Sequence, residues 1–222
     1  MKVRTESYLE QVARWPKQGQ HILAHFDETS VVVYQAYRPA IGHFAATHGS
    51  FGGEFSLTRM SWIKPNFLWM MFRAGWGMKE GQETILAVRI KRSAFDTLLE
   101  QAVHSTYTAE VYASEAEWKD ALTRSEVRLQ WDPDHDPSGA RVERRALQLG
   151  LRGQVLAHYA HDWILDLEDI TEYVHHQHGY AQSHAYQQLV LPQETVYPVT
   201  TESVIRRLGL SVDLADGART DG

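Results

Sequence analysis

Hydrophobic and polar residues follow two different periods along the chain, and these periods predict a mixture of strands and helices. The apolar run over Ser30–Tyr37 and the alternating pattern over Thr84–Lys91 predict buried strands. Apolar residues at helical spacing predict helices over 65–74, where Pro65 occupies the first position, and over 93–103. Strands and helices succeed each other without strict alternation or repeats. The pattern therefore predicts an α+β fold with a mixed or antiparallel sheet and flanking helices.

Later segments give further local predictions. Ser114 and Glu117 have the spacing of a capping box that opens a helix to about Arg124. Residues 127–131 predict a strand that ends before a proline-punctuated loop, DPDHDPSG. Residues 142–159 are predicted to hold one or two helices, on which neighbouring acidic and basic side chains form charge pairs along an exposed face.

Length and composition restrict the classes of protein that the chain can represent. Its 222 residues fit one globular domain, predicted over 1–211, followed by an acidic, glycine-bearing tail over 212–222. The absence of cysteine excludes disulfides, thiolate catalysis and cysteine-ligated metals. No signal region or apolar span is evident, so a cytoplasmic protein without a membrane partner is predicted. The formal net charge of −6 argues against broad, charge-driven binding of duplex nucleic acid.

The most distinctive segment runs from Phe55 to Trp76 and combines aromatic residues with cations. It contains three tryptophans and three methionines, and Arg59, Lys64 and Arg73 recur among them. Aromatic faces stack on flat ligands, and arginine and lysine bind phosphate, so the mixture suits a pocket for a flat, anionic ligand. The structural alternative is a packed helix whose cations extend to its edge.

Two groups of residues have the composition of metal sites. The first combines Asp132, Asp134 and Asp136 with Glu143, and the second combines His175, His176, His178 and His184. The aspartates have calcium-loop spacing, but Pro137 occupies the position where such a loop needs glycine. Adjacent histidines point apart on a helix, which leaves two of the four on one face. We therefore predict a surface turn and a solvated helix end, and no metal site.

Several blocks of the chain resemble a mostly bacterial family known as domain of unknown function 4291. The resemblance spans roughly residues 1–178 and rests on the blocks YLEQVARWP, VVVYQAYRPAIGHFA, FSLTRMSWIKPNFLWMMFRAGWG, VRLQWDPDHDPSG and ERRALQLGLRG. It implies a single intact domain and carries no assigned activity.

A more distant resemblance is to ADP-ribosyltransferase-like folds, which place an arginine or histidine, a serine and a glutamate on successive elements. Arg38, Ser61 and Glu143 occur in that order, although the Ser-Thr-Ser block and the Glu-x-Glu pair are absent. The resemblance implies an enzyme that uses NAD as its substrate and transfers ADP-ribose to a nucleobase, a nucleic-acid end or a protein side chain, or hydrolyses NAD. Arginine would bind the pyrophosphate, an aromatic residue the nicotinamide, and glutamate would stabilise the ribosyl cation.

The predicted site then has two parts. The catalytic residues are Arg38, Ser61 and Glu143, and the residues that bind the nucleotide are Tyr37, Arg59, Trp62, Lys64, Asn66, Trp69, Arg73, Arg144 and Arg145.

Two other classes of function remain open from the sequence. The first is a non-catalytic module for single-stranded nucleic acid or a nucleotide, in which Trp62, Trp69 and Trp76 stack on bases. The second is a protein-interaction domain in which the aromatic segment is entirely core.

Overall fold

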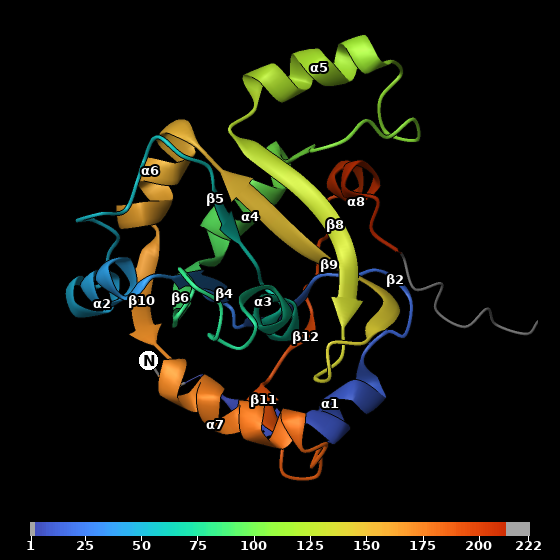
Figure 1. The fold of residues 1–222 in the computed structure, drawn as a ribbon. Coiled ribbons are helices and arrows are strands. Elements are labelled where there is room, and N and C mark those ends of the chain that lie inside the picture. Colours follow the sequence, from blue (N-terminus) through green and yellow to red (C-terminus); the bar gives the residue numbers. More distant parts are fainter. Residues whose placement is uncertain (1–2, 212–222) are drawn as a thin grey trace, which may run out of the picture.

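The computed structural model describes residues 3–211, which form one α+β domain built around two sheets (Figure 1). The strands are β1 (Thr5–Ser7), β2 (Gly19–Gln20), β3 (Leu23–Phe26), β4 (Ser30–Tyr37), β5 (Ser61–Ile63), β6 (Thr84–Lys91), β7 (Val103–His104), β8 (Val127–His135), β9 (Arg141–Leu151), β10 (Ile164–Asp169), β11 (Val190–Pro192) and β12 (Thr195–Val196). The helices are α1 (Tyr8–Arg14), α2 (Pro39–His48), α3 (Phe67–Ala74), α4 (Arg92–Gln101), α5 (Glu115–Arg124), α6 (Gly153–His161), α7 (Thr171–Gln182) and α8 (Glu202–Leu208). The tail predicted over 212–222 lies outside the described residues.

The first sheet is antiparallel and has the strand order β10-β6-β4-β3-β12. Its centre is the pair β4 and β6, which are in register along their whole length from Ser30 opposite Lys91 to Tyr37 opposite Thr84. Both strands were predicted from their apolar patterns, and the structure confirms them.

The second sheet is mixed and centres on the hairpin of β8 and β9, with the order β2-β9-β8-β7. The short strand β5 pairs with the end of β9, where Ser61 lies opposite Leu151. A backbone bridge between Tyr34 and Lys64 joins this end of the second sheet to β4 of the first. The chain from 61 to 64 is therefore the point at which the two sheets meet.

Two hydrophobic cores lie on opposite faces of the first sheet. One face of β4 and β6, including Val33 and Val88, packs against β9 residues such as Leu149 and against α4 and α6. The other face, including Tyr34 and Ala87, packs against α1, α3 and α7. The sheet is consequently a central layer, whereas α5 projects from the top of the molecule as drawn in Figure 1 and buries no residue.

The predicted α+β class is confirmed, but the helix expected after residue 142 is wrong. Residues 141–151 form β9, and a helix begins only at Gly153. The register with β8 explains the difference, because Leu147, Leu149 and Leu151 alternate into the core with the period of a strand. In addition, the predicted loop after residue 131 is shorter, since β8 continues to His135.

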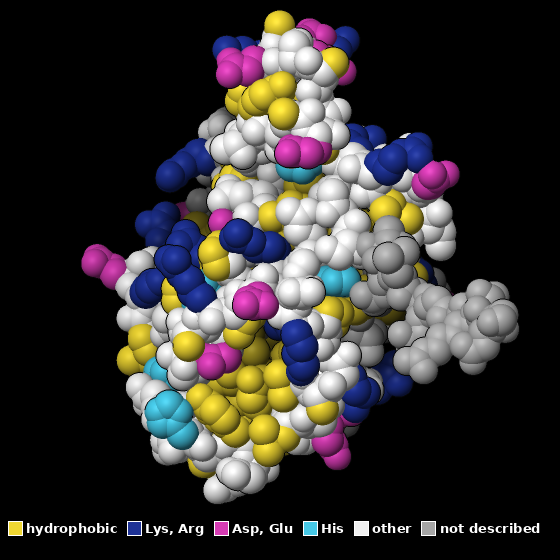
Figure 2. Space-filling model, turned by 90° about the vertical axis from the view of Figure 1, so that its right-hand side faces the viewer, with side chains coloured by type: hydrophobic (Ala, Val, Ile, Leu, Met, Phe, Trp, Pro, Cys, Tyr) yellow, Lys and Arg dark blue, Asp and Glu magenta, His cyan; other side chains and the backbone are white. Residues whose placement is uncertain are grey.

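The surface is mixed in character. In the face shown in Figure 2, hydrophobic side chains gather in the lower half, with charged side chains around and above them. Within residues 3–211, no helix has the length and apolar character needed to cross a bilayer.

Candidate functional site

A pocket of about 500 Å³ lies where β4 ends, α2 begins and the loop before β5 returns to the sheet junction. Its lining contains four of the predicted site residues, which are Tyr37, Arg38, Arg59 and Ser61. The remaining lining residues are Ile41, Glu54, Phe55, Ser56, Met60 and Gly81. We call this the junction pocket.

A buried hydrogen-bond network lies beneath the junction pocket. The amide of Gln35 donates to the hydroxyls of Tyr37 and Ser61 over 2.8 and 2.9 Å, and those two hydroxyl oxygens are 2.6 Å apart. From α6, the Tyr159 hydroxyl donates to the Gln35 carbonyl over 2.6 Å. Gln35 and Tyr159 are 2% and 0% exposed, so the network holds the two hydroxyls of the lining in fixed positions.

The chemistry of this network favours binding over nucleophilic attack. Burial raises the pKa of the Tyr37 hydroxyl well above its usual range, so this group stays protonated at neutral pH. The Ser61 hydroxyl accepts a hydrogen bond from the side-chain amide of Gln35. An amide does not take up a proton, so Gln35 does not act as a general base. Ser61 therefore lacks an activating base among its described partners and serves as a hydrogen-bonding group.

The rim of the junction pocket carries its charges. Arg38 directly precedes α2 and forms an ion pair with Glu54, and both side chains are more than half exposed. Arg59 is also exposed on the loop before β5. The pocket thus combines a neutral, hydroxyl-bearing floor with two guanidinium groups and one carboxylate at its mouth.

The predicted catalytic glutamate does not reach this pocket. Ser61 pairs with Leu151, and Glu143 lies eight residues away along β9, which separates the two Cα positions on β9 by roughly 26 Å. Glu143 is exposed there. The structure therefore brings Arg38 and Ser61 together and leaves Glu143 at the opposite end of the strand.

Three other predicted ligand residues have different surroundings. Arg144 is 5% exposed, and its guanidinium bonds Asp134 and the carbonyl of Pro16. Asn66 caps α3 by accepting from the Trp69 amide over 2.7 Å. Neither side chain is available to a phosphate. Arg145 is exposed and faces away from Arg144 because successive strand residues point to opposite faces.

Apart from Arg59, the cations and tryptophans of the aromatic segment do not line the junction pocket. Trp62 and Lys64 point to the face of β5 opposite Ser61 because side chains alternate along the strand. Trp69 and Trp76 are 4% and 8% exposed. The three tryptophans consequently do not form one accessible stacking surface, and the half-buried Trp62 is the most open of them.

The three aspartates considered for calcium have separate partners. Asp132 accepts from two glutamine amides, Asp134 binds Arg144, and Asp136 accepts from the backbone of its own turn at Ser138. Over residues 3–211, no group of three or more histidine, aspartate or glutamate side chains is arranged to hold a metal ion.

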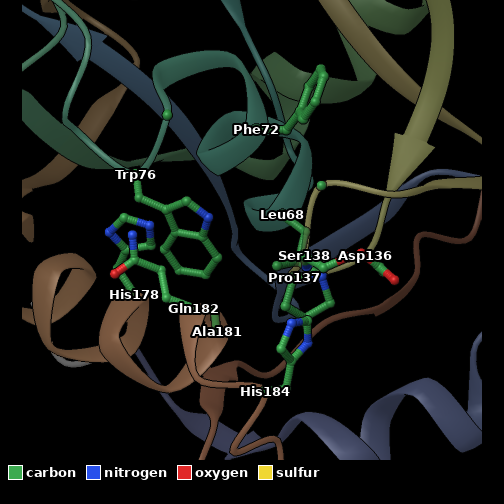
Figure 3. Close-up of a pocket in the computed structure, with 12 residues that line it drawn as sticks. Leu68, Phe72, Trp76, Asp136, Pro137, Ser138, His178, Ala181, Gln182 and His184 are labelled. Carbon is green, nitrogen blue, oxygen red and sulfur yellow. Dashed lines mark hydrogen bonds between the residues drawn. The ribbon is translucent and has the colours of Figure 1, made fainter.

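A second pocket of about 440 Å³ lies between α3, α7 and the β8–β9 turn (Figure 3). Trp76 and His178 lie side by side along one wall, with ring planes 10° apart, and Pro137 lies across from them. Trp76 has a backbone φ of 56°, which is uncommon for a bulky residue. Among the residues that the structure describes, no lysine or arginine lines this pocket, so an anionic ligand fits the junction pocket better.

The sequence analysis did not identify Glu54 in the lining of the junction pocket, or Gln35 and Tyr159 in the network beneath it. Gln35 is the only polar member of the apolar run from Val31 to Ala36 apart from the Tyr34 hydroxyl, which marks it as a buried polar group that needs partners. Glu54 and Tyr159 gave no comparable signal, because their positions beside Arg38 and Gln35 follow from the folding of separate segments.

The fold and this site define an α+β domain with a polar pocket at the junction of two sheets. The chain belongs to the family described as Domain of unknown function (DUF4291), whose model matches residues 21–197. Comparison with curated proteins returns no match.

Proposed function

We propose that the protein binds a nucleotide-type ligand in the junction pocket. The observation that carries this proposal is the convergence of Tyr37, Arg38, Arg59 and Ser61 on one cavity of about 500 Å³. This volume is within the range of roughly 300–1,000 Å³ that is usual for small-molecule sites.

Each part of the pocket matches one part of a nucleotide. The guanidinium groups of Arg38 and Arg59 suit a phosphate or pyrophosphate at the exposed mouth. Phe55 and Tyr37 offer aromatic surface to a base, with ring centroids 5.8 Å apart. The fixed hydroxyls of the floor suit the hydroxyls of a sugar.

Binding is tested by the melting temperature of the protein with AMP, ADP, ADP-ribose or NAD. A ligand that binds only the folded state stabilises it by about 2.7 kcal/mol at about 100 times its Kd. We expect Arg38→Ala and Arg59→Ala to lose this shift. Arg124→Ala, on the projecting helix α5, is the matched control and should retain it. An equal shift in all three variants, or no shift with any nucleotide, would contradict the proposal.

Cleavage of NAD is a second candidate, and the position of Glu54 favours it. Glu54 is the only carboxylate that lines the pocket among the described residues, and it is paired with Arg38. In this reaction the bond between ribose C1′ and the nicotinamide nitrogen breaks, and nicotinamide leaves with the bonding electrons. The carboxylate stabilises the ribosyl cation, and water or an acceptor hydroxyl adds to C1′ and loses a proton.

Variants of Glu54 and Glu143 distinguish which of the two carboxylates acts in NAD cleavage. Glu54 is the candidate from the pocket, and Glu143 is the one predicted from the order of residues along the chain. We expect Glu54→Gln to abolish nicotinamide release and to leave NAD binding within a few-fold of the unmodified protein. Glu143→Gln is the matched control and should release nicotinamide normally, because Glu143 lies at the far end of β9. Loss of nicotinamide release in the Glu143 variant alone would show that Glu143, and not Glu54, is the catalytic carboxylate.

A further inference from the structure

The cavity between α3, α7 and the β8–β9 turn has two walls that face each other (Figure 3). Trp76 and Ala181 form the apolar part of one wall, and Leu68 and Pro137 form that of the other. We call this space the α3–α7 pocket. Its volume of about 440 Å³ is within the range of roughly 300–1,000 Å³ that is usual for small-molecule sites.

Two residues of the α3–α7 pocket have a backbone conformation that side chains rarely adopt. Over residues 3–211, Trp76 and His184 are the two non-glycine residues with positive φ, at 56° and 54°, and both line this pocket. A bulky residue is strained in this conformation, and such strain clusters at ligand-binding and other functional positions. The Trp76 indole lies beside His178, with ring centroids 5.3 Å apart. The coincidence of both residues at one cavity indicates a binding site.

No permanent charge points into the α3–α7 pocket. Asp136 is the one acidic residue of its described lining, and its carboxylate points away from the space between the walls (Figure 3). One oxygen of that carboxylate accepts from the backbone amide and the hydroxyl of Ser138. Burial lowers the pKa of His178, and the charge of His175 lowers it further, so this imidazole is neutral at neutral pH. The pocket therefore suits an uncharged ligand.

Neutral hydrogen-bonding groups lie at the edges of the two walls. The side-chain amide of Gln182 is exposed and forms no hydrogen bond with residues 3–211, so it offers two donors and an acceptor. The ring nitrogens of His178 also have no hydrogen bond in the described part of the chain. His184 Nδ1 is 3.1 Å from the Tyr186 hydroxyl, which leaves its Nε2 for a ligand. Apolar walls with a neutral polar edge match a flat ring that carries donors and acceptors on its rim.

We propose that the α3–α7 pocket binds an uncharged planar heterocycle with an amide edge, the class to which nucleobases belong. The ring lies between the Trp76 wall and the Pro137 wall, where an aromatic surface stabilises it by stacking. The Gln182 amide pairs with the donor and acceptor on the edge of the ligand, and the two imidazoles bind the groups beside them. The site is distinct from the junction pocket, with which it shares no lining residue among those described.

Binding of free bases tests the proposal. Adenine and uracil are titrated into the full chain at pH 7.5, and Kd is measured by ligand-observed NMR, with glucose as an uncharged, non-planar comparison. We expect at least one base to bind with a Kd below about 1 mM and glucose to bind at least about tenfold more weakly. Absence of binding by both bases, or glucose binding as tight as that of the better base, overturns the proposal.

Two exposed glutamines locate the bound base. Gln182→Ala removes the amide and should weaken binding about three- to tenfold, because hydrogen bonds to the ligand are lost. Gln187→Ala, at an exposed position outside the pocket, is the matched control and should leave Kd unchanged. Trp76→Leu removes the stacking surface and should weaken binding by at least about fivefold.

The glutamine pair decides the matter even if the Trp76 variant does not fold. A base that binds equally well to the Gln182 and Gln187 variants lies elsewhere on the protein, which overturns the proposal. Arg38→Ala should leave the Kd of the base unchanged, because Arg38 lines only the junction pocket. Failure of nucleotide binding and failure of base binding are therefore distinguished by different variants.

Discussion

Arg144 and Lys64 are two buried cations on the same side of the second sheet, and they differ in their partners. Arg144 donates to Asp134 over 2.8 and 2.5 Å and to the Pro16 carbonyl over 2.7 Å, and its guanidinium lies 5.3 Å from the centroid of the Trp15 ring. Lys64 is equally buried and has no such partner among the described residues. Two cations with the same exposed fraction can therefore differ in how the fold satisfies their charge, because Arg144 is bonded within the protein and the Lys64 amine is not.

The largest effect should follow from breaking the structural pair. Asp134→Ala leaves the Arg144 charge buried without its carboxylate, which should lower the free energy of unfolding by about 3–5 kcal/mol. A double variant with Asp134→Leu and Arg144→Met removes both charges and should recover much of this loss. Urea denaturation measures both, and a double variant as unstable as the single one would show that the pair is not the cause.

Removing the charge of Lys64 should change the free energy of unfolding in the opposite direction, towards higher stability. The folded state holds the pKa of Lys64 at about 8, below the value of about 10.5 in the unfolded chain, so the unfolded state binds more protons between these values. Stability is therefore reduced at and below pH 8, and the loss is recovered as the pH rises towards 10.5. Lys64→Met should raise the free energy of unfolding at pH 7 by roughly 3 kcal/mol. Lys119→Met, at an exposed position, should change it by less than about 0.5 kcal/mol.

Glu194 provides a third buried ionisable group and a test by pH. Burial raises its pKa well above the usual value, although the backbone amide of Phe67 opposes this shift. The folded state then holds a proton that the unfolded chain has lost, so stability falls as the pH rises above about 4.5, by up to about 1.4 kcal/mol per pH unit. Glu194→Gln should remove this contribution. Unfolding curves for both proteins from pH 5 to 8 should diverge, and parallel curves would contradict the shift.

The smallest expected effects concern two glycines. Gly150→Ala introduces a methyl group 3.0 Å from the Trp62 ring and 2.6 Å from the Met60 sulfur, which should destabilise the protein by about 1–2 kcal/mol. Gly179→Ala is the contrasting change, because its Cβ meets nothing within 4 Å on helix α7. It should stabilise the protein by about 0.5–1 kcal/mol. Thermal denaturation of both variants, with Trp fluorescence for the first, checks these signs.

Much of the fold was predictable from the sequence because its central strands have clear apolar patterns, a continuous run in β4 and an alternating one in β6. The capping box at Ser114 is also confirmed, since its hydroxyl accepts from the Glu117 amide over 3.2 Å. The segment from 141 to 151 was not predictable in the same way. Charged residues at 143–145 obscured the alternation of Leu147, Leu149 and Leu151, and only pairing with β8 decides between strand and helix.

The junction pocket was predictable in part for the same reason. Tyr37 ends the predicted strand β4 and Arg38 follows it, whereas β5, which brings in Ser61, was not predicted as a strand. Glu143 entered the predicted site through the chain order of the ADP-ribosyltransferase resemblance, and its position on β9, eight residues from Leu151, shows that this order does not bring it near Ser61. Glu54 was not predictable, because its ion pair with Arg38 depends on the path of a loop.

The last strands of the domain connect segments from both ends of the chain. β11 pairs with β1 and β12 pairs with β3, and the side chain of Glu194 accepts from the first amide of α3. During synthesis on a ribosome, the edge of the first sheet and the start of α3 remain incomplete until residue 197 has emerged. Until then the edge of β3 that β12 covers is exposed, and an uncovered strand edge can pair with other molecules.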